Sequence, residues 1–196
     1  MKELKRFTEE LAQANQIQIA DIPKIDLYID QVIQLFESNF EDARRNDKEK
    51  ILTKTMINNY AKGKLFYPIR NKKYSRNHIM LISLIYQMKS ALSINDVKQV
   101  LNGLNERAEE QGLDLERFYE SYLELQQRNL KLFREGVEQQ VQDVVEQAEI
   151  TGEEQELQQV LLIASLVHTS NLYRRAAEKL VDEMDKGGAP NGETTD

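Results

Sequence analysis

Basic and amide side chains gather in a stretch of the chain that has no acidic residue. From Lys50 to Asn95 the sequence contains nine Lys and Arg and no Asp or Glu, and this stretch includes Asn58 and Asn59. Lysine and arginine neutralise phosphates, and an asparagine amide can pair with the edge of an adenine base. These residue types therefore favour contact with a nucleic acid.

The charge of the chain is divided unevenly. The window 50–95 carries +9, whereas the whole chain carries −7, so the remaining residues carry −16. An acid inside the window would repel an anionic partner, which is the plainest physical reason for its absence. Charge alone leaves one alternative open, a solvated basic face that has no partner.

Catalytic and metal chemistry find little support in the composition. The chain has no cysteine, so thiolate zinc sites and cysteine nucleophiles are excluded. Its two histidines, His78 and His168, are far apart in sequence and form no metal-binding pair. No glycine-rich phosphate loop or nucleophile elbow occurs. We therefore expect a protein that is not an enzyme and that needs no metal and no cofactor.

Membrane and secretion signals are also missing. Residues 1–10 have no apolar core of a signal peptide, and the longest apolar run, Val160 to Val167, is too short to span a membrane. With 40% apolar residues, eight Gly and three Pro, a mostly helical protein is expected. We predict a cytoplasmic, nucleoid-associated location and no membrane partner.

A short helix is predicted to position the amide side chains. Thr53 is placed to cap it, and the helix should reach about Ala61. Gly63 is expected to end it in the left-handed conformation. The inward positions are Met56, Ile57 and Tyr60, and the outward ones are Lys54, Asn58, Asn59 and Lys62.

A tight basic turn and a core helix should follow this short helix. The turn is Arg70–Lys73, and Ser75 is predicted to cap a strongly amphipathic helix built on Leu81 and Ile85. His78, in the first turn of that helix, is expected to face solvent or phosphate. The window also contains Tyr60, Phe66, Tyr67 and Tyr74, which could stack on unpaired bases, but their helical and turn positions favour core packing.

Two further helices are predicted to flank the window. Asp26, after Pro23, is a candidate cap for a helix that precedes it. Ser93 and Asp96 resemble a capping box, which should start a short helix that ends near Gly103.

The second half of the chain is predicted to be a long helical hairpin. One helical pattern runs from Asp114 to about Gln147 and another from Glu153 to about Asp185, with Thr151-Gly152 as the turn. The second helix is apolar nearly all round between Val160 and Val167, which one neighbour cannot cover. We therefore predict a homodimer, with dimerisation residues Val160, Leu161, Ile163, Ala164 and Val167.

The order of elements in the window resembles that of a known DNA-binding domain. The segment Thr53–Pro68, then Lys73-Tyr74-Ser75, then Ile79–Leu101 is similar to the winged-helix domain of MerR-like regulators. The resemblance covers about 50 residues. It implies a recognition helix for the major groove and a basic wing for the backbone.

A closer resemblance is to a bacterial family known only as domain of unknown function 1836. Its members pair an Ile-Pro-x-Ile-Asp-x-Tyr segment with a Leu-Thr-Lys-Thr-Met-Ile-Asn-Asn-Tyr core, which occur here at Ile22–Tyr28 and Leu52–Tyr60. This resemblance covers roughly residues 20–105 and implies transcription regulation.

These observations predict an all-α protein, with at most a vestigial β wing. Its parts would be an N-terminal helical extension (1–20), a MerR-like helix-turn-helix domain (21–105), a helical hairpin for dimerisation or regulation (106–186) and a disordered tail (187–196). The predicted function is sequence-specific binding of double-stranded DNA by a dimer that regulates transcription, with the hairpin open to an unknown effector. The predicted DNA contacts are Thr53, Lys54, Thr55, Asn58, Asn59, Lys62, Lys64, Arg70, Lys72, Lys73 and Arg76.

Two other functions fit the same residues. The first is a helical adaptor whose basic face docks an acidic protein, with the acidic hairpin as a second interaction surface. The second is binding of single-stranded RNA. Retention on heparin together with a shift of duplex DNA would favour the regulator over the adaptor.

Overall fold

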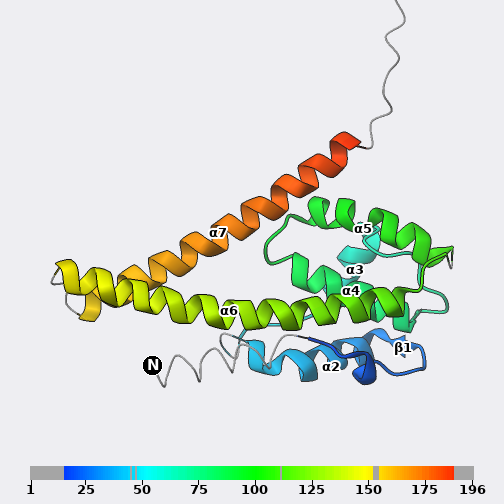
Figure 1. Cartoon of the computed structure of the whole chain (residues 1–196). Helices are drawn as coiled ribbons and strands as arrows, with labels where there is room; N and C mark the ends of the chain where they lie inside the picture. Colours follow the sequence, from blue (N-terminus) through cyan, green and yellow to red (C-terminus); the bar gives the residue numbers. More distant parts are fainter. Residues whose placement is uncertain (1–15, 45, 47, 111, 152–154, 188–196) are drawn as a thin grey trace, which may run out of the picture. The chain divides into compact units, whose positions relative to one another are not determined.

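The structure, a computed structural model, describes residues 16–44, 46, 48–110, 112–151 and 155–187. This part of the chain forms six α-helices, two short 3-10 helices and two short strands (Figure 1). In chain order they are η1 (Ile19–Asp21), β1 (Leu27–Tyr28), α2 (Ile29–Phe40), η2 (Glu41–Ala43), α3 (Lys54–Lys62), β2 (Lys73–Tyr74), α4 (Arg76–Met88), α5 (Ile94–Glu109), α6 (Leu115–Thr151) and α7 (Gln155–Gly187).

The chain divides into two compact units, the first ending at Gln126 and the second starting at Gln127. The division falls inside α6 and therefore later than residue 105, where the sequence analysis placed a boundary. The first turns of α6 belong to the first unit because Leu115, Tyr119 and Leu123 are buried in its core. Of the predicted N-terminal extension, residues 1–15 lie outside the described residues, as do residues 188–196 of the predicted tail.

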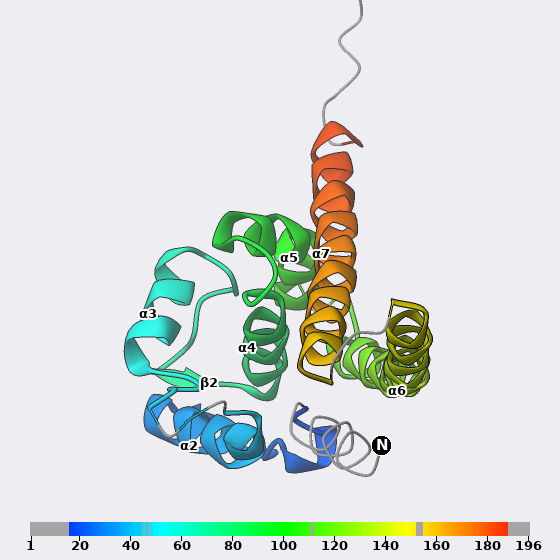
Figure 2. The same cartoon turned by 90° about the vertical axis from the view of Figure 1, so that its left-hand side faces the viewer.

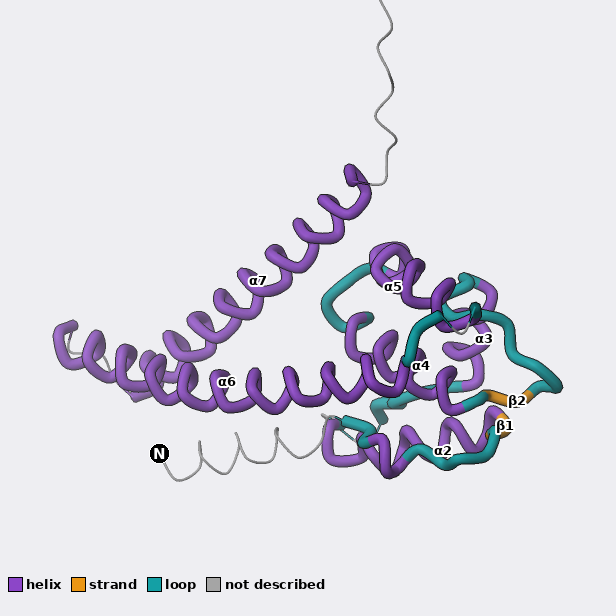
Figure 3. Tube along the Cα trace, turned by 45° about the vertical axis from the view of Figure 1, so that its right-hand side comes forward, coloured by secondary structure: helices purple, strands orange, loops and turns teal. Residues whose placement is uncertain are grey.

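The predominantly helical fold is confirmed, and the only β structure in the described residues is very small. Strands β1 and β2 pair antiparallel, with Leu27 opposite Tyr74 and Tyr28 opposite Lys73. Figure 3 shows this two-stranded ribbon beside the start of α2. It joins two segments that are far apart in the sequence.

The start of α2 corrects one prediction. Asp26 was expected to be the N-cap, but Leu27 and Tyr28 are extended because they pair with β2, so the helix starts later. Tyr28 is the N-cap residue, and its backbone N–H donates to Oε1 of Gln31 at 2.9 Å. The predicted cap was therefore wrong by two residues, since strand pairing overrode a local signal.

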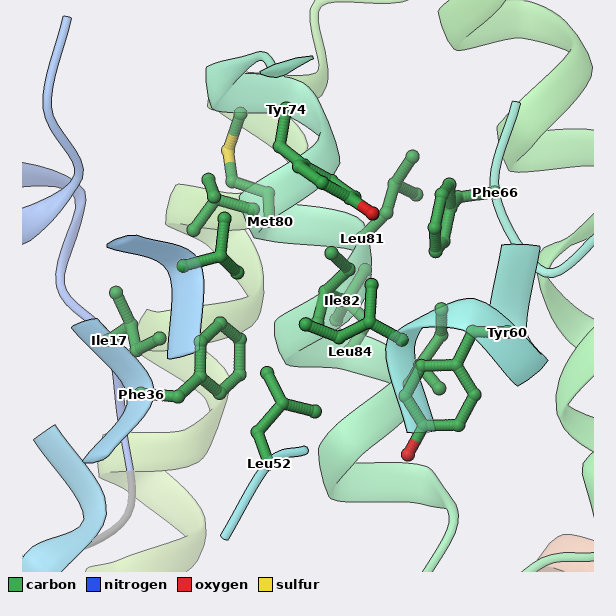
Figure 4. Close-up of a cluster of buried hydrophobic side chains, with 14 of the residues drawn as sticks. Ile17, Phe36, Leu52, Tyr60, Phe66, Tyr74, Met80, Leu81, Ile82 and Leu84 are labelled. Carbon is green, nitrogen blue, oxygen red and sulfur yellow. The ribbon is translucent and has the colours of Figure 1, made fainter. Parts of the chain in front are cut away.

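Helix α4 is the centre of the first unit. All side chains from His78 to Ile85 are buried, so the helix is covered on every side. Figure 4 shows Met80, Leu81, Ile82 and Leu84 surrounded by side chains from the other elements. The predicted core helix is confirmed.

Helix α5 is longer than predicted. The capping box is confirmed, with Ser93 Oγ accepting the N–H of Asp96 at 3.2 Å and the Asp96 carboxylate accepting the N–H of Ser93 at 3.1 Å. The predicted end near Gly103 is wrong, because α5 continues to Glu109. Gly103 is exposed, and its missing Cβ would meet no atom within 4 Å, so nothing there forces the helix to stop.

Tyr119 fastens the start of α6 to the first unit. Its hydroxyl donates to the carbonyl of Ile17 at 3.0 Å and accepts from the Ser83 hydroxyl at 2.9 Å. All three groups come from different elements of the chain. The fully buried Tyr119 therefore joins the N-terminal segment, α4 and α6.

The second unit consists of the rest of α6 together with α7. The two helices contact each other where Gln140 Nε2 donates to Thr169 Oγ1 at 2.8 Å. The predicted dimerisation residues lie on α7 and are all exposed, including Val160 at 57% and Ile163 at 62%. No helix in the described part of the chain has the length and apolar character needed to cross a membrane.

Candidate nucleic-acid interface

Helix α3 has a buried inner face and an exposed, polar outer face. The Thr53 hydroxyl accepts the N–H of Met56 at 3.1 Å, which is the predicted N-cap. Ile57 and Tyr60 are buried and attach the helix to the core. The outer face carries the exposed side chains of Lys54, Thr55, Asn58, Asn59 and Lys62.

The end of α3 corrects the role predicted for Gly63. Its φ of −71° is ordinary helical geometry, and the residue with positive φ is Lys64, at 57°. A Cβ on Gly63 would lie 2.6 Å from Cδ1 of the buried Leu65. A larger residue at position 63 would therefore have to displace the Leu65 side chain, and Lys64 takes the left-handed conformation instead.

The basic turn Arg70–Lys73 is a tight reversal with two left-handed residues. Asn71 and Lys72 have φ of 51° and 58°, and the N–H of Lys73 donates to the carbonyl of Arg70 at 2.9 Å. Positive φ at both central positions is the geometry of a type I′ hairpin turn. The turn exposes Arg70, Asn71 and Lys72, while Lys73 is half-buried with its Nζ 5.2 Å from the ring centre of Tyr28.

Three lysine and asparagine residues are thus held in a conformation that costs an L-residue about 1–2 kcal/mol. They are Lys64, Asn71 and Lys72. Glycine would avoid this cost in the folded state, and asparagine adopts the left-handed conformation more readily than lysine does. Figure 2 shows that α3 and β2 lie on the same side of α4, which brings the basic turn to the side of the unit that carries α3.

His78 supports the turn from inside and does not face solvent, so that prediction was wrong. The residue is 4% exposed. Its Nδ1 accepts the N–H of Ser75 at 3.2 Å, which places the proton on Nε2, and Nε2 donates to the carbonyl of Tyr67 at 3.1 Å. Burial lowers the pKa of His78, although the hydrogen bond to Tyr67 opposes this shift. His78 therefore acts as a neutral cross-link beneath the basic turn.

The aromatic side chains of the window pack inside the unit. Phe66 and Tyr74 are buried, with ring centres 6.2 Å apart, and Tyr67 lies 4.2 Å from the His78 ring. Tyr60 is also buried, its hydroxyl has no hydrogen-bond partner in the described structure, and burial raises its pKa to about 12. Core packing, the favoured interpretation, is confirmed, and these rings are not arranged as a platform for unpaired bases.

A buried amide holds the segment after α3. Asn105, on α5, donates through Nδ2 to the carbonyl of Leu65 at 2.7 Å. The segment between α3 and the basic turn is thus fixed to a helix 40 residues away in sequence. The two proposed contact regions, α3 and the basic turn, are therefore both attached to the core of the first unit.

The Arg76 guanidinium forms hydrogen bonds with groups of the protein itself. Its guanidinium forms two hydrogen bonds with the Glu116 carboxylate, at 3.1 and 2.9 Å, and donates to the carbonyls of Ile19 and Ile22. These partners tie α4 to α6 and to the N-terminal segment. In this conformation the guanidinium is not available to a phosphate, so we leave Arg76 out of the interface.

The structure thus brings most of the predicted contacts onto exposed surface. Eight of the eleven are exposed, whereas Thr53, Lys73 and Arg76 are half-buried. Within the described residues, none of the five exposed bases forms an ion pair with an acid; they are Lys54, Lys62, Lys64, Arg70 and Lys72. Sequence reasoning missed Asn71, whose signal was an asparagine between bases, a residue type that tolerates positive φ.

The connection that precedes α3 is unlike the turn of a helix-turn-helix motif. The connection from α2 to α3 runs from residue 41 to residue 53 and contains η2, whereas the turn of that motif has about 3–4 residues. The described residues also contain no group of three acidic or histidine side chains placed to hold a metal ion.

Comparisons with known proteins give one match. A family model described as "Domain of unknown function (DUF1836)" matches residues 17–122, which is more than half of the chain. No curated protein and no solved structure matches. The matched region extends into the first turns of α6 and ends close to the boundary of the first unit.

Proposed function

The chain belongs to the DUF1836 family, and we propose that it is a sequence-specific double-stranded DNA-binding regulator of transcription that acts as a dimer. The observation that carries the proposal is the exposed face formed by α3, Lys64 and the basic turn. Together, α3, Lys64 and the basic turn carry five exposed bases, and α3 also carries the exposed amides of Asn58 and Asn59. Such a regulator would work in the cytoplasm, at the nucleoid.

The chemistry of α3 suits the major groove. A helix of nine residues fits this groove, where Asn58 or Asn59 would pair with an adenine edge and Lys54 would reach a guanine or a phosphate. Thr55 offers a hydroxyl beside them. This mixture of amide, hydroxyl and charge favours reading of bases over simple docking on an acidic surface.

The basic turn suits the phosphate backbone. Arg70 and Lys72, together with Lys62 and Lys64 from the end of α3, would give affinity that does not depend on sequence. In this proposal α3 is the recognition helix and the turn is a minimal wing, as the likeness to MerR-like regulators implies. The connection between α2 and α3, which contains η2, is longer than the short turn of a helix-turn-helix motif, although the two helices contact each other.

The test is selection of bound sites from a random duplex library, followed by affinity measurements on the selected site. Asn58→Ala should cost about 1–3 kcal/mol on that site and leave non-specific binding nearly unchanged. Lys72→Ala should weaken binding to all duplexes alike. Lys98→Ala, which removes an exposed base on α5 outside the window, is the matched control and should change neither.

Failure of duplex binding at low salt would overturn the proposal. Co-purification of an acidic protein through the same lysines would then support the adaptor function. Preference for single-stranded RNA over duplex DNA would also contradict the proposed binding of double-stranded DNA.

A further inference from the structure

Helix α3 turns one row of its exposed side chains directly away from the core. Successive side chains of an α-helix point about 100° apart around its axis. The inward side chains fix the rotation of the helix, because Ile57 and Tyr60 are 0% and 4% exposed and Met56 is half-buried. On the opposite side lies a row spaced at three and four residues, called the α3 ridge, which comprises Thr55, Asn58 and Lys62.

The two neighbouring asparagines of α3 point in different directions. Asn58 is on the α3 ridge, whereas Asn59 is on a flank of the helix, beside the half-buried Met56. Lys54 is on the other flank, beside Ile57. A recognition helix in the major groove turns its outward side chains to the base edges, while the phosphates lie on either side of the groove. Asn58 therefore faces the bases, and Asn59 faces the backbone.

The Asn58 amide is not used to cap the helix. The Thr53 hydroxyl caps the start of α3, and at its end the N–H of Gly63 donates to the carbonyl of Asn59 at 2.8 Å. Among the described residues, no hydrogen bond or ion pair involves the side chain of Asn58. Its amide donor and its amide acceptor are thus both available to the edge of a base.

We propose that Asn58 reads an adenine and that the Thr55 methyl group packs on the thymine methyl of the adjacent base pair, so that α3 selects two consecutive A·T pairs. An asparagine amide pairs with N6 and N7 of adenine, and a threonine methyl group recognises the methyl group of thymine. Thr55 and Asn58 are about 4.5 Å apart along the helix axis, close to the spacing of about 3.4 Å between base pairs. This assignment rests on the proposed function, to which it adds the base pairs that α3 selects.

An adenine analogue in the selected site tests the contact of Asn58. 7-Deazaadenine pairs normally with thymine but lacks the N7 acceptor, so at the contacted position it should lower the affinity of the native protein about tenfold. Asn58→Ala should bind the natural site about tenfold more weakly than the native protein and lose nothing further with the analogue. Fluorescence anisotropy measures these affinities.

Two further asparagine variants are compared with Asn58→Ala. Asn59→Ala should weaken binding to selected and unrelated duplexes alike and should keep the full sensitivity to 7-deazaadenine, because Asn59 faces the backbone. Asn95→Ala removes an exposed amide on α5, so it is the matched control and should behave as the native protein.

Uracil in place of thymine tests the contact of Thr55. Uracil lacks the methyl group of thymine, so its substitution in the adjacent base pair should lower the affinity of the native protein about threefold. Thr55→Ser keeps the hydroxyl and loses the methyl group. This variant should bind the natural site about threefold more weakly than the native protein and should be insensitive to uracil. Full sensitivity to uracil in Thr55→Ser would remove Thr55 from the contact.

Two kinds of failure can be distinguished. If the native protein binds duplexes but selects G·C pairs, or if Asn58→Ala keeps its sensitivity to 7-deazaadenine, the assignment of Asn58 to adenine is wrong and the proposed function stands. If the native protein binds no duplex at low salt, both the proposed function and this assignment are wrong.

Discussion

The two units of the chain, which α6 joins, differ in how completely they bury their apolar side chains. The first unit has a continuous core that includes Phe36, Ile57, Leu81 and Tyr119. In the second unit, the buried hydrophobic residues among those described are Val137, Ala148 and Val181. Meanwhile α7 leaves Ile163 and Tyr173 62% and 76% exposed.

This difference indicates where each unit obtains its stability. The first unit closes around α4, and the buried side chains of Tyr119 and Asn105 form hydrogen bonds inside it, although the Tyr60 hydroxyl and Oδ1 of Asn105 have no hydrogen-bond partner among the described residues. The second unit leaves several apolar side chains of α7 exposed. We therefore expect mutations in the first unit to act on folding and mutations in the second to act on assembly.

The largest expected effect comes from a pair of phenylalanines, one in each unit. Phe36 is fully buried against Phe40 and Tyr86, so Phe36→Ala should lower the free energy of unfolding by about 3–5 kcal/mol. Phe133 on α6 is 41% exposed, and Phe133→Ala should cost less than about 1 kcal/mol. Urea denaturation followed by circular dichroism measures both. Equal losses would mean that the second unit has a closed core of its own.

Two arginines allow folding and binding to be separated within the first unit. Arg76→Ala removes the bonds to Glu116 and to two carbonyls, so it should lower the free energy of unfolding by about 2–3 kcal/mol while the folded fraction keeps its DNA affinity. Arg70→Ala should lower the DNA affinity and leave the free energy of unfolding nearly unchanged, because Arg70 is exposed in the basic turn. Denaturation measures the free energy of unfolding of each variant, and fluorescence anisotropy measures its DNA affinity. Loss of affinity in folded Arg76→Ala would return Arg76 to the interface.

The stabilisation that His78 gives beneath the basic turn should decrease in acid. Burial lowers the pKa of His78 below the ordinary value of 6.5, so in mild acid the unfolded chain binds a proton that the folded protein does not. Stability should therefore be full above pH 6.5 and fall as the pH drops from 6.5 toward the lower pKa of the folded state. The free energy of unfolding between about pH 8 and pH 5 should show this decline in the native protein and a weaker one in His78→Gln. An unchanged pH profile in the variant would show that another group titrates.

The smallest expected effect on stability is at Lys72. Glycine relieves the left-handed strain but gives the unfolded chain more freedom, and the two effects are of similar size. Lys72→Gly should thus change the free energy of unfolding by less than about 1 kcal/mol while it weakens binding to every duplex. A variant that binds DNA as tightly as the native protein would remove the basic turn from the interface.

Local signals in the sequence predicted much of the fold. Thr53 and the Ser93–Asp96 pair act on backbone groups within one helical turn, and each forms the expected bond. The burial pattern of α3 followed from helical periodicity, so the exposed side chains of the site could be predicted.

Contacts between distant parts of the sequence could not be predicted. The pairing of β1 with β2 moved the start of α2, and Arg76 looked like a free base because its partner Glu116 lies 40 residues away. His78 was misplaced for the same reason, since its burial depends on packing around Tyr67 and Tyr74. Charge patterns locate such residues but do not reveal their partners.

The most direct test of the proposed function is the salt dependence of duplex DNA affinity for the intact protein. Each phosphate that a base neutralises contributes about −0.9 to the slope of log affinity against log salt concentration. If each subunit uses roughly four of the five exposed bases of α3, Lys64 and the basic turn, a dimer should give a slope of about −7. A slope near zero would contradict the account, because it would mean that α3 and the basic turn do not face nucleic acid.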